Sequence, residues 1–267
     1  MSDSILRVKD VVKDYRQTSG MFKRDTLLRA VDHVSFDVHP GEIVCLLGES
    51  GCGKSTLARM IMHLARPTSG TIVLDGLEIQ DLSERQFRAH RKAVQMVYQN
   101  PFDCLDPSRS VRALLEEPLK LWRAGLSRDE RADRMSEVLA QCGLDEGCLT
   151  KKPSQFSGGQ LQRLSIARAL LVGPRLLIAD EIVSALDVPI QNQILNLLTH
   201  MKEEHGFSVL FITHDLSVAR KVSDRVMVMN QGKIIGIGTP HNVLDSPTDP
   251  YIKQLADSVF TFEGDPS

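Results

Sequence analysis

The sequence predicts an α/β fold in which a core of buried strands carries an antiparallel β subdomain and a helical insertion. Four strand-like apolar runs each end at a glycine or a polar residue, at Gly48, Gln99, Asp180 and His214. Three other stretches indicate edge strands of an antiparallel sheet, at residues 5–15, 31–38 and 71–75. The segment 101–154 loses strand character and contains two helical patterns, at 110–124 and 127–142.

The first core strand, residues 42–47, leads into a glycine-rich loop. This loop fits the pattern G-x-x-x-x-G-K-[ST] with Gly48, Glu49, Ser50, Gly51, Cys52, Gly53, Lys54 and Ser55. Residues 54–65 then predict a helix, and free N–H groups at a helix start attract anions. We expect Lys54 to reach the β- and γ-phosphates of ATP and Ser55 to bind Mg²⁺, with Thr56 in the same site. The alternative is a turn that binds nothing.

Two acids, Asp180 and Glu181, stand at the end of another buried strand-like run. Asp at such a strand end is the usual second anchor for Mg²⁺ in phosphate-loop ATPases. Glu181 stands one residue further on, where a carboxylate can polarise the attacking water. The alternative is that both acids only end a strand, and the preceding phosphate loop makes the catalytic interpretation the stronger one.

Gln99 and His214 also end strand-like runs, at residues 94–98 and 208–213. Ligands of open α/β sheets bind outside the carboxyl ends of the strands, so all four strand ends are expected to face one crevice. The Gln99 amide oxygen would contact Mg²⁺ or the attacking water, and His214 would hydrogen-bond the γ-phosphate. Without the phosphate loop, each would be read as an ordinary surface or core residue.

The remaining elements follow from the same periodicities. We expect a charged surface helix at 82–92, a helix at 188–205 and a hairpin at 226–239 that turns at Gln231-Gly232. The stretch Met21-Phe22-Lys23-Arg24 is basic and apolar. A solvated loop is the favoured interpretation there, and contact with a lipid headgroup or a partner is the alternative.

The segment Phe156-Ser157-Gly158-Gly159-Gln160 precedes an expected helix at 161–171 and resembles the signature of ABC-family ATPases. The resemblance implies a phosphate-loop, RecA-like core. It also implies that Ser157, Gly158, Gly159 and Gln160 bind the γ-phosphate held by the other subunit, an anion at a helix start. Residues 184–187 resemble the family's D-loop, which places Asp187 across the dimer interface. Tyr15 matches the aromatic residue that stacks on adenine.

Further segments resemble the peptide and nickel importer subfamily, at residues 99–107, 187–191 and 246–255, as does the long insert 16–33. Two departures stand near the motifs: Ile182-Val183 replace the usual Pro-Thr, and Phe156 replaces the usual Leu. The sequence predicts three parts. The ATPase core with the β subdomain comprises residues 1–98 and 165–245, the helical signature subdomain comprises 99–164, and the C-terminal tail comprises 246–267.

The resemblance also implies partners and a location. These are a second ATPase subunit (a paralogue or a second copy), two membrane-spanning permease subunits and an extracytoplasmic solute-binding protein, at the cytoplasmic face of the inner or plasma membrane. Di- or oligopeptides are the favoured cargo, with nickel, metal chelates or other small solutes as alternatives. DNA-repair and chromosome-type ABC ATPases insert coiled coils or zinc modules, whereas only residues 56–156 separate the two motifs here.

Composition agrees with this interpretation. A net charge of −2 with 25% charged residues gives no nucleic-acid footprint. The five cysteines show no metal-binding spacing and indicate reduced thiols of a cytosolic protein. The first residues lack a signal-peptide core, and no apolar run approaches the ~18 residues of a membrane helix. We therefore expect a soluble chain that contacts the membrane through permease subunits.

Overall fold

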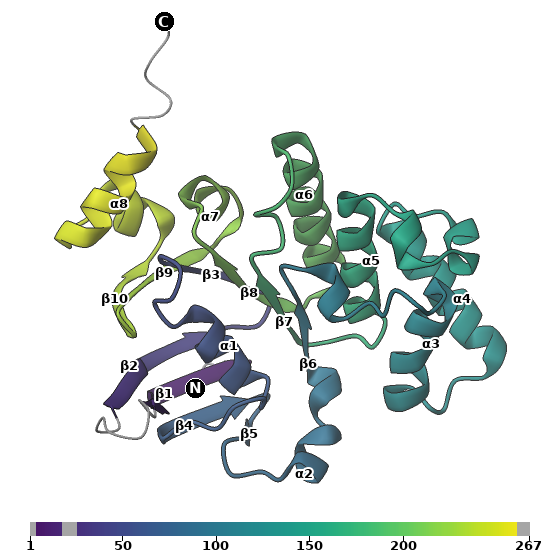
Figure 1. The fold of residues 1–267 in the computed structure, drawn as a ribbon, viewed down its shortest axis with the longest axis horizontal. Coiled ribbons are helices and arrows are strands. Elements are labelled where there is room, and N and C mark those ends of the chain that lie inside the picture. Colours follow the sequence, from purple (N-terminus) through teal and green to yellow (C-terminus); the bar gives the residue numbers. More distant parts are fainter. Residues whose placement is uncertain (1–3, 18–25, 261–267) are drawn as a thin grey trace, which may run out of the picture. The chain divides into compact units, whose positions relative to one another are not determined.

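The structure, a computed structural model, describes residues 4–17 and 26–260 (Figure 1). The stretch Met21-Phe22-Lys23-Arg24 lies outside the described residues. The chain forms two compact units. The first unit comprises the chain up to Phe87 and from Leu210 onward, and the second comprises Arg88–Val209.

An antiparallel sheet forms one part of the first unit. Its strand order is β2-β1-β4-β5, with bounds β1 (Leu6–Gln17), β2 (Thr26–Val38), β4 (Ser69–Leu74) and β5 (Leu77–Glu78). In β2 the buried side chains of Val34, Phe36 and Val38 alternate with more exposed ones, which is the period of a half-buried strand. The predicted antiparallel sheet is confirmed. Its edge assignment is wrong for β1 and β4, because β1 pairs with both β2 and β4, and the short β5 covers β4.

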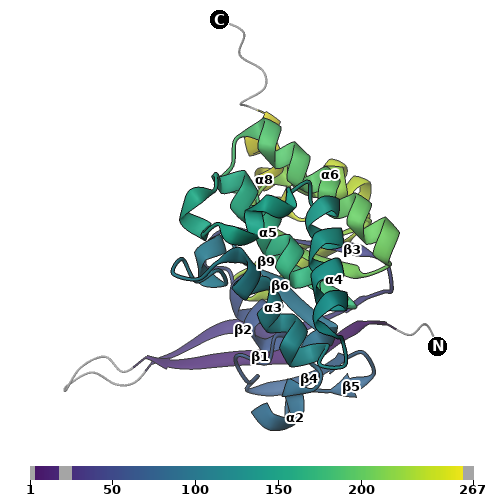
Figure 2. The same ribbon diagram turned by 90° about the vertical axis from the view of Figure 1, so that its right-hand side faces the viewer.

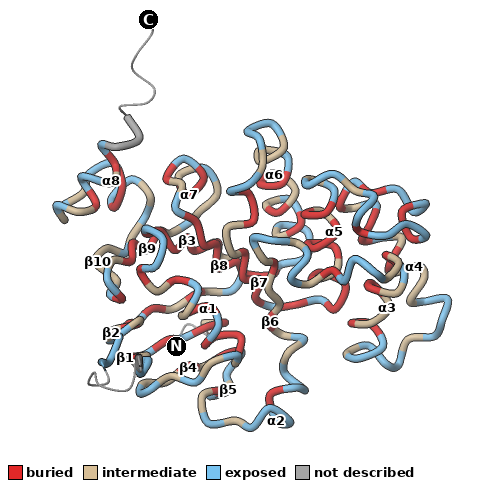
Figure 3. The backbone as a smooth tube through the Cα atoms, in the orientation of Figure 1, coloured by how far each residue is buried: buried red, intermediate tan, exposed pale blue. Residues whose placement is uncertain are grey.

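The core strands of the first unit follow the order β10-β9-β3-β8, with bounds β3 (Ile43–Leu47), β8 (Ser208–Thr213), β9 (Arg225–Asn230) and β10 (Lys233–Gly238). Every residue of β3 and β8 is buried (Figure 3), so both read as continuous apolar runs in the sequence. Strand β9 runs parallel to β3 and antiparallel to β10. The predicted hairpin turns at Gln231 (φ 46°) and Gly232 (φ 82°), both left-handed as a two-residue turn requires.

The helices of the first unit are α1 (Lys54–Ile61), α2 (Glu84–Arg88), α7 (Leu216–Val222) and α8 (Pro250–Phe260). Helix α1 ends earlier than the predicted Ala65, because His63 adopts a left-handed φ of 55° and the N–H of Leu64 bonds back to the Arg59 carbonyl. The predicted helix 82–92 is shorter than expected. Only α2 and a 3₁₀ turn at Arg91–Ala93 form there, since Phe87 is the one buried side chain of α2 and the 3₁₀ turn buries none.

The second unit pairs β6 (Val94–Val97) in parallel with β7 (Leu176–Asp180) and adds the helices α3 (Val111–Trp122), α4 (Arg128–Gln141), α5 (Gly158–Leu170) and α6 (Val188–His205). Helix α5 packs against α3, α4 and α6 (Figure 2). Serines cap the predicted helices: Ser110 is the N-cap of α3 and Ser127 is the N-cap of α4, and each side chain accepts a backbone N–H. Within residues 4–17 and 26–260, no helix has the length and apolar character needed to cross a bilayer.

Candidate functional site

The phosphate loop lies between β3 and α1 and needs its glycines. Gly53 caps α1 with a left-handed φ of 116°, and a Cβ there would lie 2.3 Å from the Ala30 carbonyl oxygen. A Cβ on Gly48 would lie 2.3 Å from the Met229 carbonyl oxygen and 2.7 Å from the Cys52 Sγ. Backbone therefore packs directly on backbone around the loop, so both positions require glycine.

Lys54 lies inside this loop. Its side chain is only 4% exposed, and its Nζ donates to the carbonyl oxygens of Gly48 at 2.6 Å and Glu49 at 2.9 Å. The hairpin turn of β9 and β10 supports the loop from outside, because the Gly232 N–H donates to the Cys52 carbonyl at 2.9 Å. A buried cation with three donors, beside the first turn of α1, makes this loop a site for a polyanion. Ser50, Gly51 and Ser55 are exposed around it, and Thr56 and Gly53 are half-buried.

Replacing Gly53 with alanine is expected to reduce nucleotide affinity strongly and to lower stability. The new methyl group would meet the Ala30 carbonyl, and overpacking of this kind costs about 1–3 kcal/mol in addition to left-handed strain. Nucleotide titration and thermal unfolding measure the two effects. The matched control is Gly41→Ala, where φ is 72° but no atom lies within 4 Å of the new carbon. Equal losses in both variants would contradict the steric argument.

His214 and Tyr15 also belong to the first unit. His214 is exposed directly after β8, and the loop that carries it is fixed because the Asp215 N–H donates to Thr213 Oγ1 at 3.0 Å. Asp215 Oδ1 then caps α7 by accepting the N–H groups of the next turn. Tyr15 lies in β1, is 38% exposed and has the Lys13 Nζ 5.0 Å from its ring centroid. Both side chains can therefore be reached by a ligand.

The second unit carries the predicted acids and Gln99. Asp180 is the last residue of β7, and Glu181 follows it with a left-handed φ of 49°. Such a backbone is uncommon for a residue other than glycine, and strained residues cluster at functional sites. Gln99 Nε2 donates to Ser184 Oγ at 3.2 Å, and Ser184 Oγ donates to the Glu181 carbonyl at 2.9 Å. Sequence reasoning missed Ser184 as this bridge, because no motif indicates a contact between two loops.

The signature segment forms the start of α5. This helix begins at Gly158, earlier than the predicted Leu161, because Ser157 is its N-cap. Ser157 and Gln160 form a reciprocal capping box, in which each side chain accepts the other residue's backbone N–H. A Cβ on Gly159 would lie 2.6 Å from Ile190 Cγ2, so this glycine lets α5 approach α6 closely. The exposed first turn leaves unpaired helix N–H groups for an anion.

The structure places the predicted residues in two groups. Tyr15, Gly48 to Thr56 and His214 lie in the first unit. Gln99, Asp180, Glu181, the residues Ser157 to Gln160 and the exposed Asp187 lie in the second. Within the second unit, hydrogen bonds through Ser184 join Gln99 to the Glu181 backbone.

The described residues offer few groups for metal or thiol chemistry. No group of three or more His, Cys, Asp or Glu side chains is arranged there to hold a metal ion. The expected Mg²⁺ donors are instead a hydroxyl, an amide oxygen and one carboxylate, all hard oxygen ligands that suit Mg²⁺. Burial raises the pKa of Cys142 to about 12, and it raises the pKa of Cys52 against the opposing charge of Lys54. These thiols are protonated at neutral pH and therefore poorly reactive.

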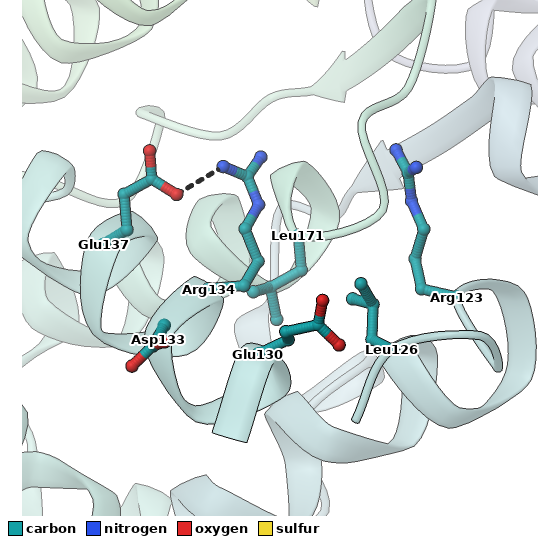
Figure 4. A pocket seen from close by; sticks show the side chains of 7 residues that line it. All are labelled: Arg123, Leu126, Glu130, Asp133, Arg134, Glu137 and Leu171. Atoms are coloured by element: carbon teal, nitrogen blue, oxygen red, sulfur yellow. Dashed lines mark hydrogen bonds and ion pairs between the residues drawn. The ribbon is translucent and has the colours of Figure 1, made fainter. Parts of the chain in front are cut away.

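A separate hollow of about 560 Å³ lies in the second unit (Figure 4). It is lined by acidic, basic and apolar side chains: Arg123, Leu126, Glu130, Asp133, Arg134, Glu137 and Leu171. Its two arginines are already engaged, since Arg123 donates to the Val172 carbonyl and Arg134 to Glu137 at 2.7 Å. None of the predicted site residues lines it.

Relatives of known kind match almost the whole chain. The chain is 45% identical over 259 residues to the oligopeptide transport ATP-binding protein AppF of Bacillus subtilis, which covers 96% of this chain and 78% of that protein. It is 39% identical over 255 residues to the dipeptide transport ATP-binding protein DppF of Escherichia coli. That match covers 96% of this chain and 76% of DppF. It is also similar to a probable peptide ABC transporter ATP-binding protein of Sinorhizobium fredii, at 43% identity over 96% of this chain and 72% of that one.

Solved structures share the fold. A dimeric ATP-binding cassette in a post-hydrolysis state, bound to ADP and Pi, superposes with a TM-score of 0.77 at 31% identity and covers 88% of this chain and 98% of that chain. The cbiO1 protein of Clostridium perfringens superposes with a TM-score of 0.79 at 27% identity, over 98% and 99%. These matches confirm the predicted α/β phosphate-loop fold. A sequence profile described as ABC transporter matches residues 31–184, and with the glycine loop around Lys54 it shows that the chain belongs to the ABC transporter family as an ATP-binding cassette.

Proposed function

We propose that this chain binds and hydrolyses ATP to power the import of di- or oligopeptides. The observation that carries the ATPase part is the buried Lys54 ammonium inside a glycine loop at the start of α1. Relatives named as oligopeptide and dipeptide transport ATP-binding proteins, at 45% and 39% identity, support the peptide cargo. An ATP-binding cassette does not itself contact cargo, so kinship is what bears on the substrate.

The nucleotide is bound mainly through its phosphates. The N–H groups of the phosphate loop and of the first turn of α1 bind the phosphate oxygens, and Lys54 gives up its two carbonyl partners to reach the β- and γ-phosphates. Tyr15 stacks on the adenine. His214 hydrogen-bonds the γ-phosphate from the end of β8. This binding prepares the terminal phosphate for attack by water.

Hydrolysis depends on positioning and charge. Ser55, Asp180 and Gln99 would hold Mg²⁺ through oxygen atoms, and the ion would supply positive charge against the charge that develops on the phosphates. The Glu181 carboxylate orients the attacking water and accepts its proton. Ser184 holds the Glu181 backbone to the Gln99 side chain, so the two residues act from a fixed geometry.

A second cassette completes each site. Ser157, Gly158, Gly159, Gln160 and Asp187 serve the nucleotide bound by the other subunit, because the exposed first turn of α5 offers N–H groups to an external anion. Peptide-type importers imply two different ATPase subunits, so a paralogue is the expected partner in the cell. Two permease subunits and an extracytoplasmic binding protein complete the transporter, with this chain at the cytoplasmic face and residues 99–164 as its helical subdomain.

The proposed function is tested on the assembled transporter. The tagged chain is purified from its native membrane, its partners are identified, and ATP turnover is measured in lipid with and without a peptide-loaded binding protein. We expect a paralogous ATPase and two permeases to co-purify and turnover to rise with the loaded binding protein. Turnover that is indifferent to the binding protein would argue against an importer. Recovery of this ATPase alone with the permeases would contradict the heterodimer only.

A further inference from the structure

Tyr15 lies near the end of β1, beside β2 (Figure 1), and its main chain is held in place. It pairs with Leu28 of β2, and the N–H of the preceding Asp14 donates to Thr68 Oγ1 at 2.9 Å. The Asp14 carboxylate also accepts two hydrogen bonds from the Arg29 guanidinium, at 2.9 Å and 3.2 Å. Tyr15 is nevertheless 38% exposed, and an exposed side chain can rotate about its own bonds, so the main chain alone does not orient the ring.

The side chain of Lys13 restrains this ring. Its Nζ lies over the face of the Tyr15 ring, 5.0 Å from the ring centroid, which is within the range of a cation–π contact. The same Nζ donates to the carbonyl oxygen of Arg66 at 2.6 Å. Arg66 lies in the segment between α1 and β4, so the ammonium connects the ring to the segment that follows the phosphate-loop helix.

The ammonium leaves one face of the ring open for stacking. An aromatic ring has two faces, and Lys13 covers one of them, so a base can stack only on the other. The charge of Lys13 acts through the ring as well. Aromatic rings carry negative charge above their faces, and this charge opposes face-to-face stacking. A cation on the covered face draws π electrons away from the open face and lowers this repulsion, so position and charge favour the same arrangement.

We propose that Lys13 is a positioning residue for ATP, whose ammonium covers one face of the Tyr15 ring and so presents the other face to adenine. Lys13 acts through Tyr15, since its own donor is bound to the Arg66 carbonyl. The inference rests on the proposed stacking of adenine on Tyr15. It assigns the affinity for the base to two residues of β1, separately from the phosphate contacts of Lys54.

The variant Lys13→Met keeps an unbranched side chain and removes the charge. We expect its dissociation constant for a non-hydrolysable ATP analogue with Mg²⁺ to rise about two- to fivefold, the equivalent of an exposed cation–π contact. The dissociation constant for inorganic tripolyphosphate with Mg²⁺ should not change, because this ligand has no base. Titration calorimetry on the full chain gives both constants. A loss of affinity for both ligands would show a general structural role and overturn the proposal, as would an unchanged or higher affinity for the ATP analogue.

Matched variants separate the causes. Lys13→Arg keeps a cation that can lie over the ring, and we expect it to bind the analogue about as tightly as the wild type. Lys9→Met removes the same charge from an exposed position of the same strand and should leave both constants unchanged. In the Tyr15→Leu background, which has no ring, Lys13→Met should not alter the affinity for the analogue. An effect that persists without the ring, or an equal loss in Lys9→Met, would overturn the inference.

Tyr15→Leu by itself tests the stacking on which the inference rests. We expect it to bind the ATP analogue more weakly than the wild type does and to bind tripolyphosphate equally well. If it binds the analogue as tightly as the wild type, adenine does not stack on Tyr15, and the inference is overturned while the ATPase assignment stands. A wild-type chain that binds neither ligand would instead reject the proposed function.

Discussion

Replacing Glu181 with glutamine is expected to abolish most ATP turnover while ATP binding persists. The amide keeps the size of the side chain but cannot accept a proton from water, and general-base help is worth roughly 10²–10⁴ in rate. Because hydrolysis stops with both nucleotides bound, a closed ATP-bound dimer should accumulate. Turnover assays beside size-exclusion chromatography with Mg-ATP measure both effects.

The Glu181 variant has a clear contrast in Lys54→Ala. Lysine contacts the phosphates directly, so its loss should weaken ATP binding itself through a charge-assisted contact. Glu181→Gln should leave the Tm unchanged, because glutamine meets the same left-handed backbone strain at φ 49° as glutamate. Turnover close to the wild type would remove Glu181 from the role of base.

Arginine in place of Ser157 is expected to abolish dimer closure and turnover while a single chain still binds ATP. Ser157 is exposed at the start of α5, where a large cation would obstruct the nucleotide of the opposing subunit. The change also removes a helix cap, which costs about 0.5–2 kcal/mol. Nucleotide titration at a concentration where the chain is monomeric measures ATP binding by a single chain. A separate turnover assay measures the activity of the dimer.

The matched control for Ser157→Arg is Ser127→Arg. Ser127 forms the same type of capping box, with Glu130 at the start of α4, and has no place in the proposed nucleotide site. We expect this control to lose a similar amount of stability and to keep turnover. Mixing Ser157→Arg with Glu181→Gln chains gives dimers with two kinds of composite site. The activity of the mixture should therefore differ from the average of the two variants measured alone. Loss of ATP binding by the isolated Ser157→Arg monomer would contradict action on the opposite nucleotide.

Elements with a strong local pattern could be predicted from the sequence. Helix α6 begins and ends at the predicted Val188 and His205, because Asp187, Pro189 and Gly206 mark its ends. Strand β8 matches its predicted bounds since its six apolar or small residues are all buried. The phosphate loop was found because glycines at fixed spacing leave few alternatives for the backbone.

Other features depend on contacts that no local pattern encodes. The expected helix 82–92 forms only over Glu84–Arg88, and its one buried side chain, Phe87, stacks on the ring of the distant His63, a contact that no local pattern shows. The bridge from Gln99 through Ser184 joins two loops far apart in the chain. Helix α8 was not predicted, although its N-cap Asp249 and the following Pro250 are the residue types that begin a helix.

The bridge through Ser184 has a thermodynamic consequence. Its two hydrogen bonds, of 3.2 Å and 2.9 Å, connect the Gln99 amide to the main chain of Glu181 without any bound ligand. Coupling between two sites is reciprocal: the free energy by which the position of Gln99 biases Glu181 equals the free energy by which Glu181 biases Gln99. The Ser184 bridge thus gives the Gln99 side chain and the Glu181 main chain a shared equilibrium, in which a displacement of one changes the free energy of the other.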